Sequence, residues 1–312
     1  MNTPGLIQVV AAGVCGSDKQ RLRAGFDVRS LGHELVGRVP GGDGTLVAIR
    51  PLNPCQDCAA CAQGWTEHCA ADTSIGRLDT REGGFSGRVR AGTGQLYPIP
   101  AHLPVTVATL ADPLACVLHA LRGVRLDRGE VLVVGDGPMA ALVAVYVRQR
   151  GARQVTLAVK DTSRVGRVSD FGDRVVTAAD LKPDHYHVVV ESAGGISSEP
   201  ILTAVTAVAP LGQVVALGVY PPRVTAGFPV RTLLEKESTL RGSKAYRITD
   251  EWDDFAAALQ LLSHDHGAYA QVVTSTPAWS PDGPQLPALE HRNNTLKIVY
   301  VSDPATADDA QL

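Results

Sequence analysis

Residues 131–140 read VLVVGDGPMA, an apolar run that ends in a glycine-rich turn and passes into a stretch with helical spacing. The turn has the pattern G-x-G-x-x-A. The two glycines allow a tight turn that lets the backbone approach a dinucleotide pyrophosphate, which binds at the N-terminus of the next helix. An ordinary glycine turn is the alternative. The residues expected to bind the cofactor here are Gly135, Gly137, Pro138 and Met139.

Strands and helices alternate after this turn, which predicts right-handed βαβ units and a parallel sheet. Up to about residue 122, by contrast, the chain consists of short β-type runs separated by Gly and Pro. After residue 242 a helix and isolated strands return. We predict an α/β fold in which a doubly wound Rossmann domain (123–242) is inserted into a discontinuous β-rich domain (1–122 and 243–312).

The composition excludes several classes of protein. The 312 residues carry 29 Lys and Arg against 32 Asp and Glu, a net charge of −3, which gives no reason to expect nucleic acid or a membrane as partner. No apolar run reaches membrane-spanning length, and no signal peptide is recognisable. We expect a cytoplasmic protein, and in a reducing compartment its six cysteines favour metal or catalytic roles over disulfides.

Four cysteines are spaced C-x2-C-x2-C-x7-C within residues 51–76, a segment with few large apolar residues. Such a segment cannot offset its ordering entropy by burial, whereas four thiolates around one Zn²⁺ stabilise it. Two disulfides or unrelated thiols are the alternative. The predicted ligands of this structural zinc are Cys55, Cys58, Cys61 and Cys69.

A second group of metal-binding side chains lies in the blocks GVCGSD (13–18), GHE (32–34) and DPLAC (112–116). A catalytic zinc needs three protein ligands from Cys, His or carboxylate and one open position. Each residue also has a structural interpretation: Cys15 as a small buried side chain, His33 as a core histidine, Asp112 as an acid in the first turn of a helix.

These blocks, in this order and followed by a dinucleotide fold, resemble the zinc-containing medium-chain alcohol and polyol dehydrogenases. The resemblance implies a GroES-like catalytic domain, with Cys15 and His33 as catalytic zinc ligands and Glu34 as a ligand or near-ligand. It also implies three further roles: Asp112 as a ligand of the catalytic zinc or of its water, Ser17 as a proton relay, and Asp18 as the carboxylate that orients His33. The carboxylates favour the polyol, threonine and cyclitol branch.

Cofactor choice depends on the end of the second strand, which reads AVKDTSR (158–164). NAD enzymes place an acid there to bind the ribose 2′-OH. The corresponding position is Val159, and Lys160 and Arg164 offer charges for a 2′-phosphate, so we favour NADP(H). Asp161 leaves NAD(H) open. Ala193 and Gly218, after later strands, are expected to line the nicotinamide site.

Taken together, the motifs predict a zinc-dependent NAD(P)(H) oxidoreductase that interconverts a secondary alcohol and a ketone, on a polyol, cyclitol or sugar-like molecule. A non-catalytic nucleotide-binding protein that keeps the dehydrogenase fold is the alternative. We also expect a homo-oligomer.

Overall fold

The computed structural model describes residues 5–77, 82–127, 129–228, 230–279 and 295–302. They form two compact units. The first contains the described residues of Met1–Ala115, Ala245–His291 and Lys297–Leu312, and the second those of Cys116–Lys244 and Arg292–Leu296. No helix in these described ranges is both long enough and apolar enough to cross a membrane.

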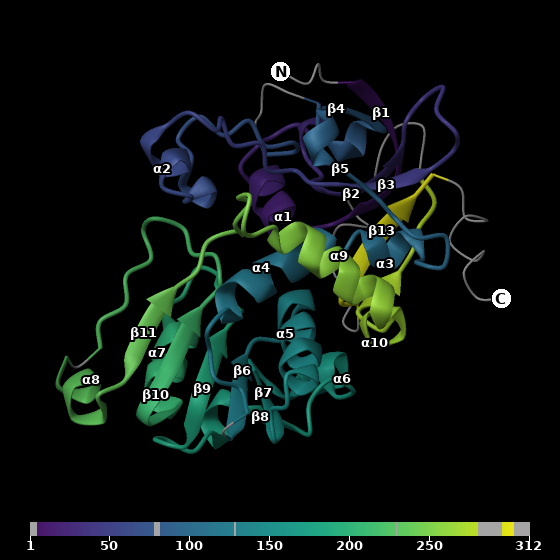
Figure 1. Ribbon diagram of the computed structural model, residues 1–312. Helices are drawn as coiled ribbons and strands as arrows, with labels where there is room; N and C mark the ends of the chain where they lie inside the picture. The colour runs from purple at the N-terminus through teal and green to yellow at the C-terminus, as the bar shows by residue number, and fades with distance from the viewer. Residues whose placement is uncertain (1–4, 78–81, 128, 229, 280–294, 303–312) are drawn as a thin grey trace. The chain divides into compact units, whose positions relative to one another are not determined.

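The second unit is built on a six-stranded parallel sheet with the order β11-β10-β9-β6-β7-β8 (Figure 1). The strands are β6 (Glu130–Val134), β7 (Gln154–Val159), β8 (Arg174–Thr177), β9 (Tyr186–Glu191), β10 (Val208–Ala216) and β11 (Thr239–Gly242). The helices are α5 (Pro138–Gln149), α6 (Val165–Val168), α7 (Glu199–Ala207) and α8 (Val230–Lys236). This is the doubly wound order, whose direction reverses between β6 and β9, and it confirms the predicted fold class.

The first unit contains a seven-stranded sheet with the order β12-β13-β1-β2-β3-β5, and β4 pairs with β1. Its strands are β1 (Gly5–Gly13), β2 (Glu34–Arg38), β3 (Leu46–Ile49), β4 (Arg88–Ala91), β5 (Leu96–Pro98), β12 (Val273–Ser275) and β13 (Lys297–Val301). Its helices are α1 (Gly16–Arg23), α2 (Ala59–Ala62), α3 (Val105–Ala108), α9 (Asp254–His264) and α10 (His266–Ala270), and α4 (Ala111–Leu121) leads into the second unit.

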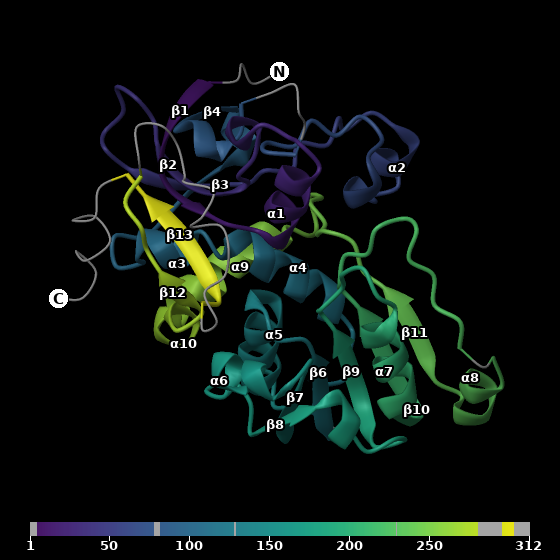
Figure 2. The same ribbon diagram turned by 180° about the vertical axis from the view of Figure 1, so that it is seen from behind.

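Strand β13 comes late in the chain but lies inside this sheet. It pairs antiparallel with β1, with Gly13 opposite Val299. Figure 2 draws β13 in yellow and β1 in purple. On its other edge β13 pairs with β12. Side chains from both ends of the chain, such as Ile7 and Tyr300, therefore share one buried core.

Three local features shape the first unit. Helix α1 begins directly after Cys15, and Phe85 lies in a 3-10 turn (Gly84–Ser86). Helices α3 and α4 are separated by residues 109–110, so the break between them precedes Pro113. Proline is tolerated in the first turn of α4 because amides there have no partner within the helix.

Candidate metal and cofactor sites

The four cysteines of residues 51–76 converge on one point. Their sulfurs all lie within 4.8 Å of one another, with 3.5 Å between Cys55 and Cys69 and 3.9 Å between Cys58 and Cys69. A disulfide would require about 2.05 Å. A tetrahedron of thiolates around Zn²⁺ with bonds of about 2.3 Å places sulfurs roughly 3.8 Å apart. The donor set and its spacing fit zinc.

The pKa values of two thiols in this cluster are shifted in opposite directions: burial raises that of Cys61 to about 12, and hydrogen bonding lowers that of Cys58. A hydrogen bond with the backbone of Cys61 is the main cause that lowers the pKa of the Cys58 thiol, to about 6. The backbone N–H of Cys55 points at the sulfur of Cys69, 3.3 Å away, and that of Cys58 at the sulfur of Cys55, 3.4 Å away. Such N–H groups stabilise thiolates, the form that binds a metal.

A second cluster joins Cys15, His33 and Glu34, whose ligand atoms also lie within 4.8 Å of one another. Cys15 is half-buried, and the other two side chains are almost completely buried. Within the described residues, no third group of His, Cys, Asp and Glu converges in this way. One thiol, one imidazole and one carboxylate match the three-ligand set of a catalytic zinc.

Helix α1 and the turn at Gly32 hold this cluster together through Asp18. The carboxylate of Asp18, fully buried, accepts hydrogen bonds from the backbone N–H of Cys15 at 2.9 Å and of Gly32 at 3.3 Å. Its other contact is His33 Nδ1, 3.3 Å from Oδ1. Burial opposes ionisation, but the charge of His33 and these hydrogen bonds hold the pKa of Asp18 below its usual value.

Gly32 is required for this arrangement. Its φ is +88°, a conformation that disfavours L side chains, and a Cβ there would lie 2.9 Å from the backbone N of Phe85. Glycine at this position therefore allows the turn that places the Gly32 N–H and the His33 ring beside Asp18.

Glu34 is paired with a lysine that the sequence analysis did not identify. Lys297, the first residue of β13, forms a very short ion pair with Glu34 and donates to the carbonyl of Val14 at 3.0 Å. Both charged side chains are at most 2% exposed. Gly13 makes room for them, because a Cβ there would lie 2.3 Å from Glu34 Oε2. The sequence feature that could have identified Lys297 is its place as a single lysine within the apolar run TLKIVYV (295–301).

Asp112 is close enough to Glu34 to affect its ionisation but lies outside the three-residue group. Burial is the main cause that raises the pKa of Glu34; the charge of Asp112 adds to this effect, while Lys297 and His33 oppose both. Asp112 Oδ1 accepts a hydrogen bond of 2.9 Å from the hydroxyl of Tyr246, another residue that the sequence did not single out. Ser17 lies half-buried on α1, two residues from Cys15.

The predicted cofactor residues lie at one edge of the parallel sheet. Gly135 follows β6, Lys160 follows β7, Ala193 follows β9 and Gly218 follows β10, and parallel strands bring these carboxyl ends together. Gly137 precedes α5, with Pro138 as the first helical residue and Met139 as the second. Gly135 has a φ of +144°, and a Cβ there would lie 2.8 Å from Ser192 Oγ.

Glu191, at the end of β9, ties two of these loops together. Its Oε1 accepts from the backbone N–H of Ala193 at 2.8 Å and of Gly194 at 2.7 Å, and its carbonyl accepts from Leu217 and Gly218. Burial raises the pKa of this carboxyl, and these backbone hydrogen bonds oppose the shift.

The end of β7 offers cations and one acid. Val159, the last residue of the strand, is buried, and Lys160 is exposed. Asp161 Oδ1 accepts from the side chain and the backbone N–H of Ser163, the latter at 3.1 Å, and the side-chain bond is the main cause of its lowered pKa. Arg164, 41% exposed, lies 3.6 Å from the carboxylate of Asp136 in the glycine turn.

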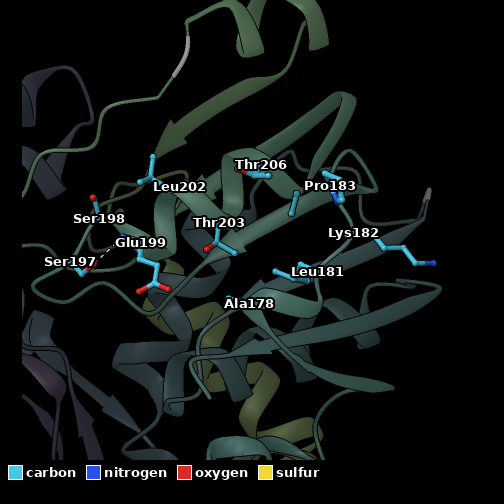
Figure 3. Close-up of a pocket in the computed structure, with 11 residues that line it drawn as sticks. Ala178, Leu181, Lys182, Pro183, Ser197, Ser198, Glu199, Leu202, Thr203 and Thr206 are labelled. Atoms are coloured by element: carbon cyan, nitrogen blue, oxygen red, sulfur yellow. Dashed lines mark hydrogen bonds between the residues drawn. The ribbon is translucent and has the colours of Figure 1, made fainter. Parts of the chain in front are cut away.

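A cavity of about 470 Å³ lies elsewhere on the second unit, along α7 (Figure 3). The side chains that line it include Lys182, Ser198, Glu199, Leu202 and Thr203, and its lining contains none of the predicted metal or cofactor residues.

The sequence of this chain is similar to those of known dehydrogenases. Residues 3–101 match the alcohol dehydrogenase GroES-like domain. The L-idonate 5-dehydrogenase (NAD(P)(+)) of Escherichia coli K12 is 29% identical over 277 residues, which cover 81% of this chain and 79% of that protein. Both matches support the family of zinc-containing medium-chain polyol dehydrogenases. The D-altritol 5-dehydrogenase of Agrobacterium fabrum is 26% identical over 96% of this chain and 92% of its own length.

Solved structures of this dehydrogenase fold superimpose over almost the whole chain. A zinc-binding dehydrogenase from Sinorhizobium meliloti 1021, bound to NADP, has a TM-score of 0.83 at 23% identity, covering 96% of this chain and 92% of its own. The E. coli L-idonate 5-dehydrogenase has a TM-score of 0.81 at 24% identity, covering 96% and 91%. At these identities the likeness concerns the fold.

Proposed function

We propose that this dehydrogenase interconverts a secondary hydroxyl and a ketone on a polyol or sugar acid, with zinc and a nicotinamide cofactor. The convergence of Cys15, His33 and Glu34 carries the proposal, because it forms a three-ligand group separate from the four-cysteine lobe, residues 51–76. The relatives support the substrate class, since they are named for L-idonate, D-altritol, L-galactonate and galactitol 1-phosphate.

The chain's own residues would prepare this site for chemistry. Asp18 faces His33 Nδ1, which leaves Nε2 as the nitrogen for the metal, and it fixes the plane of the ring. Lys297 holds the carboxylate of Glu34. Ser17, beside Cys15, is the proposed relay for the substrate proton. When bound, the zinc would supply a Lewis acid for the substrate oxygen and the nicotinamide cofactor would supply the hydride donor or acceptor.

For the cofactor we propose NADP(H) over NAD(H). Val159 supplies no acceptor for a ribose 2′-OH, and Oδ1 of Asp161 is engaged by Ser163 within its own turn. Lys160 and Arg164 supply two positive charges at the same loop, which suit a 2′-phosphate. The NADP found in the Sinorhizobium meliloti protein is consistent with this choice.

The non-catalytic alternative is not favoured, because a nucleotide-binding module has no use for a buried Cys, His and Glu cluster beside a separate structural site. Metal analysis separates the two. We propose two zinc ions per chain, one in each cluster; a single zinc confined to the four-cysteine lobe would support the alternative.

The decisive experiment is turnover of the zinc-loaded protein on a panel of polyols, sugar acids and aminocyclitols, in both directions and with both cofactors. We expect oxidation of a secondary hydroxyl in at least one polyol or sugar acid, and loss of that activity in Cys15→Ser. Protein with two zinc ions and saturating cofactor that acts on no alcohol or ketone would refute the proposal.

Two further proposals concern assembly and location. Val230 and Leu234, exposed apolar side chains on α8 shortly before the edge strand β11, support a homo-oligomer. Light scattering that finds a monomer at working concentration would exclude it. A thiolate zinc lobe needs reduced cysteines, which supports the cytoplasm as the location.

A further inference from the structure

Tyr246 is the partner that holds Asp112. Its side chain is completely buried, and its hydroxyl donates to Asp112 Oδ1 at 2.9 Å, with Asp112 itself 4% exposed. The ring packs against Phe255 of α9, with 6.0 Å between ring centroids. A buried carboxylate that accepts from a fixed hydroxyl has one oxygen committed and its plane set, while its second oxygen keeps its lone pairs for another partner.

The backbone around Tyr246 is held in an unusual conformation. Ala245, directly before it, has a φ of +47°, a region that costs a non-glycine residue free energy and persists only where surrounding contacts impose it. Arg247, directly after it, exchanges two hydrogen bonds with Asp254, one from each backbone N–H, at 2.9 and 3.2 Å. The start of α9 therefore fixes one side of this segment.

The four-cysteine lobe fixes the other side. The guanidinium of Arg247 binds both carboxylate oxygens of Glu67, at 2.6 and 3.2 Å, and the backbone N–H of Ile248 donates to Thr66 Oγ1 at 2.9 Å. Both lobe residues are buried and precede Cys69, one of the four clustered cysteines, by two and three positions. The lobe thus binds the two residues that follow Tyr246.

We propose that Tyr246 is a positioning residue that fixes the carboxylate of Asp112 beside the Cys15, His33 and Glu34 cluster, and that the four-cysteine lobe keeps Tyr246 in place through Thr66 and Glu67. The inference rests on the proposed zinc function of that cluster. The lobe then has a second role, because a metal that orders Cys69 also orders Thr66 and Glu67, which bind Ile248 and Arg247. The two clusters are then connected through one continuous set of contacts.

The first test compares Tyr246→Phe with Tyr97→Phe. Tyr97 packs on the same Phe255 ring, with centroids 5.0 Å apart, but its hydroxyl donates to Asp253 and not to Asp112. The measurements are the dissociation constant of each zinc by chelator competition, kcat, and melting temperature. We expect Tyr246→Phe to weaken the more loosely held zinc or lower kcat by roughly 10-fold or more, the usual effect of losing a group behind a metal site.

In Tyr97→Phe we expect both quantities to stay within about twofold of the wild type. A purely structural role of Tyr246 would lower the melting temperature and leave the zinc dissociation constant and kcat unchanged. That result, or equal effects of the two variants on zinc and kcat, would overturn the positioning role.

The second test concerns the lobe. Glu67→Gln keeps the size of the side chain and removes the charge that binds Arg247. If Glu67 acts through Tyr246, Glu67→Gln alone should shift the same zinc constant or kcat in the same direction, and the double variant Glu67→Gln/Tyr246→Phe should be little worse than Tyr246→Phe. No effect of Glu67→Gln, or effects that multiply in the double variant, would refute the link to the lobe.

These outcomes are distinct from failure of the proposed function. A wild-type protein inactive on every alcohol and ketone refutes that function, while the zinc constants still test the positioning role. An active wild type whose Tyr246→Phe variant behaves like Tyr97→Phe refutes the positioning role alone.

Discussion

Replacing Lys297 with methionine should destabilise the protein more than any other single lysine change among the described residues. Lys297 and Glu34 are 2% and 1% exposed and form an ion pair inside the first unit. Methionine fills much of the same volume but leaves the carboxylate of Glu34 without its cation and the carbonyl of Val14 without its donor. A buried charge left alone in this way is far more costly than a lost surface pair.

The magnitude follows from this burial. Removing one partner of a buried pair costs roughly 3–5 kcal/mol. At about 2 °C per kcal/mol, the figure for longer chains, the melting temperature should fall by roughly 6–10 °C. Zinc bound to the cluster that contains Glu34 would offer this carboxylate another positive charge, so the zinc-loaded protein should lie near the lower end of this range.

Thermal unfolding followed by circular dichroism checks the prediction. Lys182→Met, at an exposed position, is the control and should change stability by about 0.5 kcal/mol or less. The double variant Glu34→Gln/Lys297→Met should recover much of the loss, because no unpaired charge remains. If Lys297→Met melts within 2 °C of the control, or if the double variant is less stable than the single one, the buried pair does not have the role argued here.

Three other predictions concern zinc, cofactor and pH. Cys61→Ser should remove one zinc per chain and lower the melting temperature, whereas Cys15→Ser should keep fold and cofactor binding and abolish turnover; metal analysis and calorimetry distinguish them. Lys160→Ala and Arg164→Ala should each weaken NADP(H) about tenfold or more and leave NAD(H) unchanged, as titration calorimetry would show. The pKa of Glu191 is raised in the folded state, so the folded protein loses stability as pH rises through that pKa and the carboxyl ionises. The Glu191→Gln variant keeps both backbone hydrogen bonds and cannot ionise. In denaturant titrations it should be more stable than the wild type at pH 8 and lose this advantage near pH 4.

The sequence predicted the parallel-sheet unit well because local signals and tertiary structure agree there. Apolar β-branched runs such as Val131–Val134 are buried on both faces of the sheet, and the glycine turn lies between strand and helix as its spacing requires. The four-cysteine lobe was equally readable, because its ligands are neighbours in sequence.

The candidate catalytic site was only partly readable. Cys15, His33 and Glu34 lie in short blocks with a recognisable spacing, but their partners come from far along the chain. Lys297 is 263 positions after Glu34, and Tyr246 is 134 positions after Asp112. Only the antiparallel pairing of β13 with β1 and the course of residues 245–248 bring them together, and no local pattern encodes either.

The place of β13 in the middle of its sheet has a consequence for synthesis of the chain. The ribosome completes residues 116–244 of the parallel-sheet unit before it reaches residue 297, so these residues can fold while β1 is paired only with β2 and β4. Until Lys297 emerges, the carboxylate of Glu34 has no lysine and the Ala11–Gly13 part of β1 lacks its partner β13. We therefore expect the nascent first unit to be the stage at which this protein is most prone to aggregate and most dependent on chaperones.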